Sequence, residues 1–155
     1  MRRLIICLTS VLLLSCHSDN NKEKANLLLE EARASFRQGD IEAARATIDS
    51  LRKTYPNVVE ARKGALALHQ EIELKAAQDD LQQTDSLLQI VNKELDALQK
   101  QVDADKKALK ATPDELTLLT QTRMRRDSIR TQFETLGAKI LYIRKKQKET
   151  LINVE

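Results

Sequence analysis

The chain has 155 residues, half of which are Ala, Glu, Lys, Leu or Arg, and its formal net charge at pH 7 is +3. This composition is typical of long helices and coiled coils. Only three Gly and two Pro are present to form tight turns, which excludes an all-β fold or a doubly wound α/β fold. Aromatic residues make up 3% of the chain and Trp is absent, so an aromatic platform that stacks bases or sugars is excluded as well.

Residues 1–15 have the pattern of a secretory signal peptide. Arg2 and Arg3 give it a positively charged start, and an apolar stretch from Leu4 to Leu14 follows. A helix that crosses a membrane needs about 20 apolar residues, so this stretch is too short to be a membrane span. We therefore expect export across the inner membrane and removal of this segment.

Four residues at the end of the segment, Leu13-Leu14-Ser15-Cys16, resemble the lipobox of bacterial lipoproteins. The resemblance implies that residues 1–15 are removed and that Cys16 becomes the first residue, carrying diacylglycerol and an acyl chain such as palmitate. It also implies lipid attachment to a membrane of the bacterial cell envelope. The alternative is an ordinary signal peptide that is cleaved nearby, which would leave Cys16 as a plain thiol.

Removal of the signal peptide changes the charge and the cysteine content. The net charge falls from +3 to +1 without Arg2 and Arg3, and a charge near zero does not favour nucleic acid as a partner. Cys7 is also removed, so with Cys16 lipidated no thiol remains for a disulfide or a metal site. His17 stands where inner-membrane lipoproteins of enterobacteria have Asp, and this resemblance implies the outer membrane, facing the periplasm.

Residues 16–22 are expected to form a lipidated tether, and residues 23–71 a head of three helices. In the head, apolar residues recur three and four apart up to Gly39, and a second amphipathic stretch begins after Asp40 and ends at Pro56. Gly39 suits a helix C-cap and Asp40 a helix N-cap. The pattern predicts two helices joined by a tight turn, followed by the start of a third helix.

The first two helices resemble one tetratricopeptide repeat. The positions of that 34-residue motif are matched by Ala32, Gly39, Asp40, Ile41, Ala44, Ile48 and Pro56. The stretch from Gly39 to Ala61 is most similar to repeats in envelope lipoproteins of the outer-membrane assembly and Tol-Pal-associated kind, which implies a role in protein–protein contact. Leu28 replaces the Trp of the motif and no turn follows at Glu73, so a repeat array with a long peptide groove is not expected.

Residues 72–152 are expected to form a long antiparallel coiled coil of two helices. Leu or Val recurs every seven residues from Leu74 to Leu109, and this spacing indicates a coiled-coil seam. The seam is predicted to include Leu81, Leu88, Val91, Leu95, Ile129, Phe133, Leu136, Ile140 and Ile143.

The turn between the two arms is expected near residues 111–114. Thr112 and Glu115 have the spacing of a capping box, which marks the start of a helix. If the chain folds back at Thr112, paired residues have numbers that sum to about 225, and Leu88 meets Leu136.

The sequence contains no pattern typical of catalysis or metal binding. His17 and His69 are the only imidazoles, and the residues around His69 do not match the zinc motif H-E-x-x-H. No Gly-rich phosphate loop or nucleophile elbow is present. We expect no enzyme activity, no metal, no small-molecule substrate and no cofactor apart from the lipid on Cys16.

Two non-catalytic functions fit the pattern. The first is a membrane-anchored adaptor whose head holds an unidentified envelope protein. The second is a structural spacer or self-assembling coiled coil, in which the seam pairs between chains of a homo-oligomer and the polar stretch from Thr122 to Arg126 sets register or oligomeric state. A lipoprotein that acts on the membrane itself is less favoured, because neither arm has an apolar face wide enough to lie in lipid.

Overall fold

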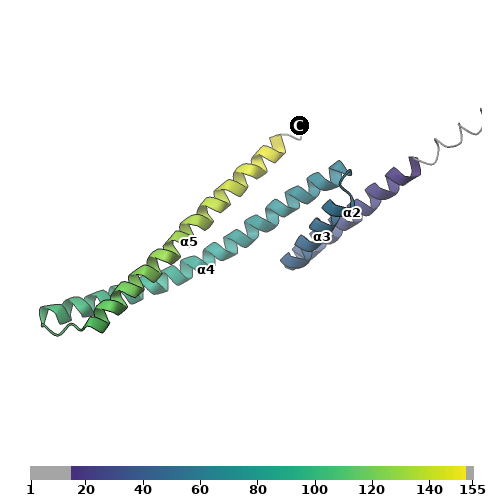
Figure 1. Ribbon diagram of the computed structural model, residues 1–155. Helices are drawn as coiled ribbons and strands as arrows, with labels where there is room; N and C mark the ends of the chain where they lie inside the picture. Colours follow the sequence, from purple (N-terminus) through teal and green to yellow (C-terminus); the bar gives the residue numbers. More distant parts are fainter. Residues whose placement is uncertain (1–14, 153–155) are drawn as a thin grey trace, which may run out of the picture. The chain divides into compact units, whose positions relative to one another are not determined.

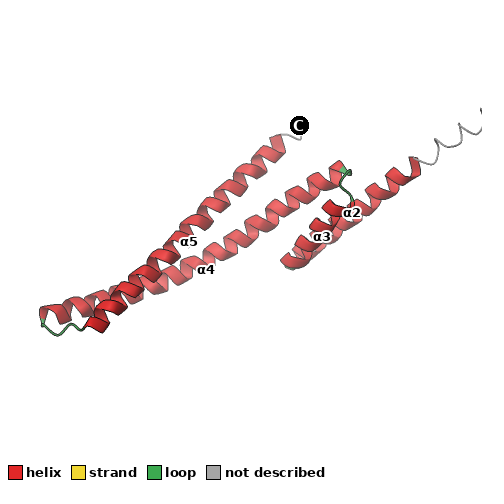
Figure 2. Cartoon of the chain, viewed as in Figure 1, coloured by secondary structure: helices red, strands yellow, loops and turns green. Residues whose placement is uncertain are grey.

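The computed structural model describes residues 15–152 of the chain, and side chains from residue 20 to residue 150. Over this range the protein is all-α, as predicted, with four helices and no strand (Figures 1 and 2). The helices are α2 (Ser15–Arg37), α3 (Ile41–Thr54), α4 (Val59–Lys107) and α5 (Pro113–Ile152).

The chain divides into two compact units, Met1–Glu73 and Leu74–Glu155, where the sequence predicts a boundary after residue 71. We call the described part of the first unit the head and the described part of the second unit the hairpin. The helix α4 contributes its first part to the head and the rest to the hairpin.

The head has a core of its own, made by α2, α3 and the first part of α4. α2 and α3 lie side by side (Figure 1). The core consists of Ala25, Leu29, Ala32, Ala44, Ile48, Leu51, Ala61, Ala65, Leu68 and Ile72. Half of these residues are alanine, which lets the helix backbones approach closely, and the few larger side chains carry most of the buried apolar area.

The turn between α2 and α3 is closed by Gly39 and Asp40. Gly39 has φ +84°. The N–H of Asp40 donates to the carbonyl oxygen of Ser35, and the N–H of Gly39 donates to that of Phe36, both at 3.0 Å. This is the Schellman pattern of helix termination. The Asp40 carboxylate accepts a hydrogen bond from the Ala43 N–H at 2.9 Å. Gly39 therefore caps the end of α2, and Asp40 caps the start of α3.

α2 begins earlier than the sequence pattern predicts. Residues 16–22, expected as a tether, belong to this helix, which starts at Ser15. The segment contains neither Gly nor Pro, and once a helix is nucleated by its packed part, each further residue adds one backbone hydrogen bond at low cost. The head therefore begins its first helix before residue 23, the predicted start of the head.

In the hairpin, α4 and α5 each present one stripe of buried and half-buried residues with alternating spacings of three and four. The stripe of α4 contains Leu74, Ala77, Leu81, Thr84, Leu88, Val91, Leu95, Leu98 and Val102. The stripe of α5 contains Glu115, Leu119, Thr122, Arg126, Ile129, Phe133, Leu136, Ile140 and Ile143. This is the heptad spacing of a coiled-coil seam, and the predicted seam residues all belong to the two stripes.

The two arms pair about one heptad away from the predicted register. Leu98 and Leu119, whose numbers sum to 217, belong to one apolar cluster. Arg123 donates a hydrogen bond across the arms to Gln99, and these numbers sum to 222. The predicted sum of about 225 is therefore wrong. In the observed register, Leu88 is level with Ile129 of the other stripe and not with Leu136.

The register differs because the turn comes earlier than predicted. α4 ends at Lys107 and α5 begins at Pro113, so the turn occupies residues 108–112. Leu109, the last member of the predicted heptad run, has left the helix with φ +57° and is 95% exposed. A shift of one arm by seven residues brings each of its seam residues to the position of the equivalent seam residue one heptad further on. The apolar pattern alone therefore did not distinguish the two registers.

The start of α5 has the capping box that the sequence predicts. The backbone N–H of Glu115 donates to the Thr112 hydroxyl at 3.3 Å, and the backbone N–H of Thr112 donates to the Glu115 carboxylate at 2.8 Å. The backbone hydrogen bond from Thr112, and then the bond from its hydroxyl, lower the pKa of Glu115. The box satisfies N–H groups that have no partner within the helix.

Leu109 occupies a position that normally belongs to glycine. The N–H of Lys110 donates to the carbonyl oxygen of Asp105 at 2.8 Å, and the N–H of Leu109 donates to that of Lys106 at 3.1 Å. The pattern is the same as at Gly39, with a leucine in the left-handed position. A side chain in that conformation costs roughly 1–2 kcal/mol.

Leu109→Gly should therefore raise the free energy of unfolding of the hairpin by about 0.5–1 kcal/mol, measured by urea denaturation. The removed side chain makes little contact because it is 95% exposed, and glycine adopts positive φ without strain. The matched change at the other turn, Gly39→Ala, should lower stability by about 1 kcal/mol. A destabilised Leu109→Gly variant would contradict this account of the turn.

Candidate functional site

The predicted lipidation site lies at the edge of the described chain. Ser15 is the first residue of α2, and Cys16 follows it in the same turn, but their side chains are outside the described residues. Leu13 and Leu14 of the predicted lipobox also lie outside the described residues. None of the helices from α2 to α5 is long and apolar enough to cross a membrane.

A groove of about 300 Å³ lies between α2 and α4 in the head, and we call it the head groove. It is lined by Arg33, Phe36, Arg37, Gly64, Ala67, Leu68 and Glu71. Leu68 belongs to the head core and Phe36 packs against that core, so the groove has an apolar floor. Arg33, Arg37 and Glu71 add charges of both signs around it.

Gly64 explains why α2 and α4 lie so close at this groove. A Cβ atom at Gly64 would lie 2.5 Å from Cδ2 of Leu29, which is closer than such atoms come in proteins. Leu29 is buried in the head core. A Cβ at this position of α4 would therefore force the buried Leu29 side chain or α2 itself to shift. Neither Gly64 nor Phe36 was predicted as a site residue, although Gly64 is the only glycine of α4 and was the available signal.

The charged residues of the head groove are only partly engaged within the head. Arg33 forms an ion pair with Glu30 at 2.6 Å, with 42% and 60% of the two side chains exposed. Exposed pairs of this kind contribute about 0–1 kcal/mol, so the guanidinium can turn to another anion at little cost. Arg37 lies in the last turn of α2, and both it and Glu71 are exposed. The groove can therefore accept an apolar side chain flanked by polar or charged groups.

One ion pair ties α3 to α4 inside the head. Nη2 of Arg45 lies 2.6 Å from Oε1 of Glu73, and Arg45 also pairs with Glu42 at 2.8 Å. Burial lowers the pKa of Arg45, but the hydrogen bonds and charges of Glu73 and Glu42 outweigh burial, and the pKa is raised. This pair links two helices of the head and does not border the groove, so its role is structural.

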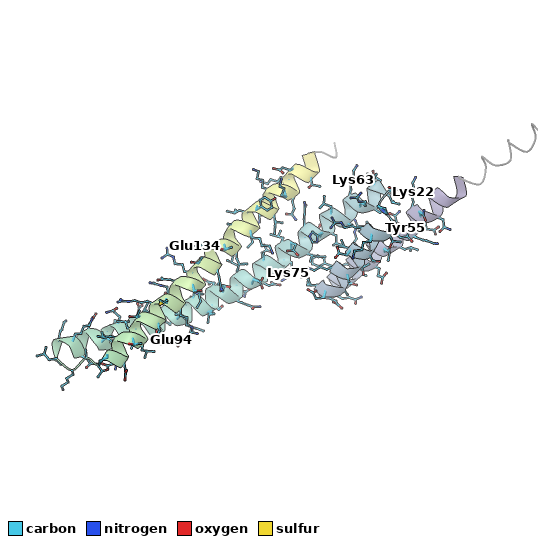
Figure 3. All side chains as sticks on the ribbon, viewed as in Figure 1. Lys22, Tyr55, Lys63, Lys75, Glu94 and Glu134 are labelled. Atoms are coloured by element: carbon cyan, nitrogen blue, oxygen red, sulfur yellow. The ribbon has the colours of Figure 1, made fainter. Side chains whose placement is uncertain are left out.

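Two arginines of α5 form ion pairs within the hairpin. Arg125 pairs across the arms with Glu94 at 3.4 Å, and Arg126 pairs with Asp127 at 2.7 Å. Figure 3 shows the side chains of both arms, with Glu94 labelled on α4. The structure thus pairs Arg125 and Arg126 with carboxylates of the hairpin.

The polar stretch that the sequence singled out does reach the seam. Thr122 and Arg126 are half-buried in the stripe of α5. A groove of about 370 Å³ includes Arg126 and is lined by Leu88, Asn92, Arg126, Arg130, Phe133 and Glu134.

The described residues offer no metal centre. No group of three or more His, Cys, Asp or Glu side chains between residues 20 and 150 could hold a metal ion. His69 lies on α4 and is half-buried.

Two helical glycines allow a direct test of the head groove. Gly64→Ala should lower the free energy of unfolding by about 1–3 kcal/mol, because the clash with Leu29 outweighs the gain in helix propensity. Gly137→Ala should raise it by about 0.5–1 kcal/mol, because a Cβ at Gly137 meets nothing within 4 Å. Chemical denaturation of both variants measures the difference, and the same sign for both would contradict the packing described.

Comparison of the chain with protein-family models, with curated proteins and with solved structures finds no match.

Proposed function

We propose that the chain is a non-catalytic lipoprotein of the bacterial cell envelope that acts as a protein–protein interaction adaptor. It is anchored by lipid on Cys16 in the outer membrane, facing the periplasm, and its head holds an envelope protein. The signal-peptide pattern and the lipobox residues Leu13 to Cys16 support the anchor. The likeness of residues 25–70 to a tetratricopeptide repeat supports the role in protein contact.

The head groove is the observation that carries the adaptor proposal. Each unit has its own apolar packing: the head has a buried core, and in the hairpin the stripe of α4 packs on the stripe of α5. The head groove remains as an apolar floor with Phe36 and Leu68, flanked by exposed charges. Apolar anchors inside a polar rim are typical of protein-binding surfaces.

Lipid attachment is tested with Cys16→Ser in the full chain. We expect the variant to lose incorporation of a palmitate analogue and to leave the membrane fraction, or to stay unprocessed. A Ser15→Ala change, which keeps a small residue before the cysteine, is the matched control and should remain lipidated. Stable membrane attachment of a Cys16→Ser chain that has lost its signal peptide would refute the lipid anchor.

The adaptor role is tested with a photo-crosslinking amino acid placed in the head groove of the full chain in cells. Ala67 is exposed and lines the groove, whereas Lys53 is exposed on α3 and lies outside it. We expect crosslinked products of defined mass from position 67 and not from position 53. Equal products from both positions, or none from either, would count against the head groove as the contact surface.

A structural spacer or self-assembling coiled coil is the second candidate function. It is favoured by the half-buried polar residues Thr84, Thr122 and Arg126 in the seam stripes, because polar seam residues specify register and oligomeric state. In that case the seam would pair between chains.

The two functions are separated by a crosslink across the seam. Gln99→Cys and Arg123→Cys, in a chain with Cys16→Ser, place two thiols where the two side chains form a hydrogen bond. A short bis-maleimide should join them within one chain, at monomer mass, if the adaptor proposal holds. Crosslinks only between chains would favour the spacer. The single variant Gln99→Cys controls for unspecific reaction.

A further inference from the structure

The C-terminal part of α5, which is yellow in Figure 1, carries a concentration of positive charge. Residues 141–148 contain four cations and no carboxylate. Leu141, Lys145 and Lys148 follow one another at spacings of four and three, so they form one stripe of the helix, and all three are exposed. The same stripe continues toward the turn with Glu134, which pairs with Arg130 at 2.9 Å. We call the basic face of α5 the set Leu141, Tyr142, Arg144, Lys145, Lys146 and Lys148.

The stripe of Leu141 and Lys145 lies on the side of α5 opposite to the seam. Ile140 and Ile143 are buried members of the seam stripe. Each residue turns the helix by about 100°, which places Leu141 and Lys145 roughly 100–160° away from both of them. Leu141 is accordingly 69% exposed, and the neighbouring Tyr142 is 61% exposed. Another surface can therefore contact the basic face without disturbing the seam.

Little of this positive charge is neutralised within the hairpin. Glu149 pairs with Lys146 at 2.7 Å and lies 4.0 Å from Lys145, whose side chain is 75% exposed. Among residues 20–150, no carboxylate pairs with Arg144 or Lys148. Four clustered Lys and Arg residues on a helix attract a surface of negative charge.

The apolar residues of the basic face favour a lipid surface as its partner. Leu141 lies among the cations, and Nζ of Lys146 is 5.7 Å from the centre of the Tyr142 ring. At a bilayer, lysines meet the headgroup phosphates, while Leu and Tyr side chains reach the boundary of the acyl chains. Two apolar side chains are too few to carry the helix into the lipid, so the contact is with the headgroup layer.

We propose that the basic face of α5 docks on the headgroups of a bilayer that contains anionic lipid. The inference rests on the proposed function in one respect, because a lipid anchor on Cys16 would hold the chain at a membrane and raise the effective concentration of headgroups. The test below uses a chain without the lipid. Its failure would therefore leave the anchor and the adaptor role unaffected, and failure of palmitate incorporation would leave binding to vesicles unaffected.

Binding is measured by cosedimentation of the chain from residue 16, with Cys16→Ser, with phosphatidylglycerol vesicles at low ionic strength. Binding should weaken with added salt, because salt screens exposed charges. One basic residue near such a surface changes the binding constant about fivefold, the equivalent of roughly 1 kcal/mol. The double variant Lys145→Gln and Lys148→Gln should therefore bind at least tenfold more weakly.

The matched control removes the same charge elsewhere in the hairpin. Lys106 and Lys107 are exposed in the last turn of α4, and the double variant Lys106→Gln and Lys107→Gln should bind like the unchanged chain. Absence of binding to phosphatidylglycerol vesicles, equal binding to neutral phosphatidylcholine vesicles, or equal weakening by the two double variants would overturn the proposal.

A tryptophan reporter tests whether this face meets lipid. The chain has no Trp, so Tyr142→Trp introduces a single one, and its emission should shift to the blue on addition of phosphatidylglycerol vesicles. Leu118→Trp, at a position of α5 that is 51% exposed, is the control and should not shift. Poly-glutamate, a polyanion without an apolar layer, should shift neither. The same shift at both positions, or an equal shift with poly-glutamate, would exclude docking on lipid through the basic face.

Discussion

Val102→Asp should lower the free energy of unfolding of the hairpin by about 3–5 kcal/mol, the largest effect of any single change in this unit. Val102 is fully buried in a cluster with Leu95 and Leu119. An aspartate there would be a buried charge without a partner, which is strongly destabilising. The change should appear as an earlier loss of helix signal in urea, followed by circular dichroism at 222 nm.

Leu88→Asp is the matched control for that prediction. Leu88 is half-buried and lines a groove together with Arg126 and Arg130, so the new carboxylate would have cations and water nearby. We expect it to cost clearly less than Val102→Asp. Equal losses from the two variants would show that the apolar cluster around Leu119 does not hold the arms together as described.

Ile48→Ala should lower the free energy of unfolding of the head by about 3–4 kcal/mol. Ile48 is fully buried in the head core, and its loss leaves a cavity between helices that are already packed through alanine. A unit of this size is only marginally stable, so the head should lose most of its protection at 37 °C while the hairpin keeps its own.

Hydrogen exchange read by mass spectrometry measures that loss for each unit separately. Leu27→Ala removes a side chain that is 64% exposed on α2, and such surface changes stay within about 0.5 kcal/mol. It therefore serves as the control. Equal loss of protection in head and hairpin for Ile48→Ala would show that the two units unfold together.

Local signals in the sequence were sufficient for most of the helix boundaries. Gly39 and Asp40 mark the turn of the head because left-handed φ and side-chain capping favour these residue types. Thr112 and Glu115 mark the start of α5 through their capping box. The end of α4 had no such mark, because Leu109 occupies a position where glycine is the usual residue. The predicted turn was consequently too late.

The sequence predicted which residues form the seam but not which residues of α4 and α5 face each other across it. Which residues line the seam follows from heptad spacing within each helix, so Leu95 and Ile129 could be assigned from the sequence. Which residues face each other depends on the turn, and one heptad of displacement keeps most apolar residues opposite apolar partners. The observed register therefore could not be derived from periodicity.

The head groove depended on tertiary structure even more than the register did. The head groove exists because Gly64 lets α2 approach α4, and the distance of Leu29 from this glycine is not encoded in any local motif.

The sequence by itself determined the all-α class, the two short helices, the long arms and the residues of their seam, because helix propensity, capping and periodicity act within a few residues of the chain. The tertiary structure decided the register of α4 and α5 and the head groove. These features result from contacts between residues far apart in sequence, where several arrangements satisfy the same local pattern and packing selects one of them.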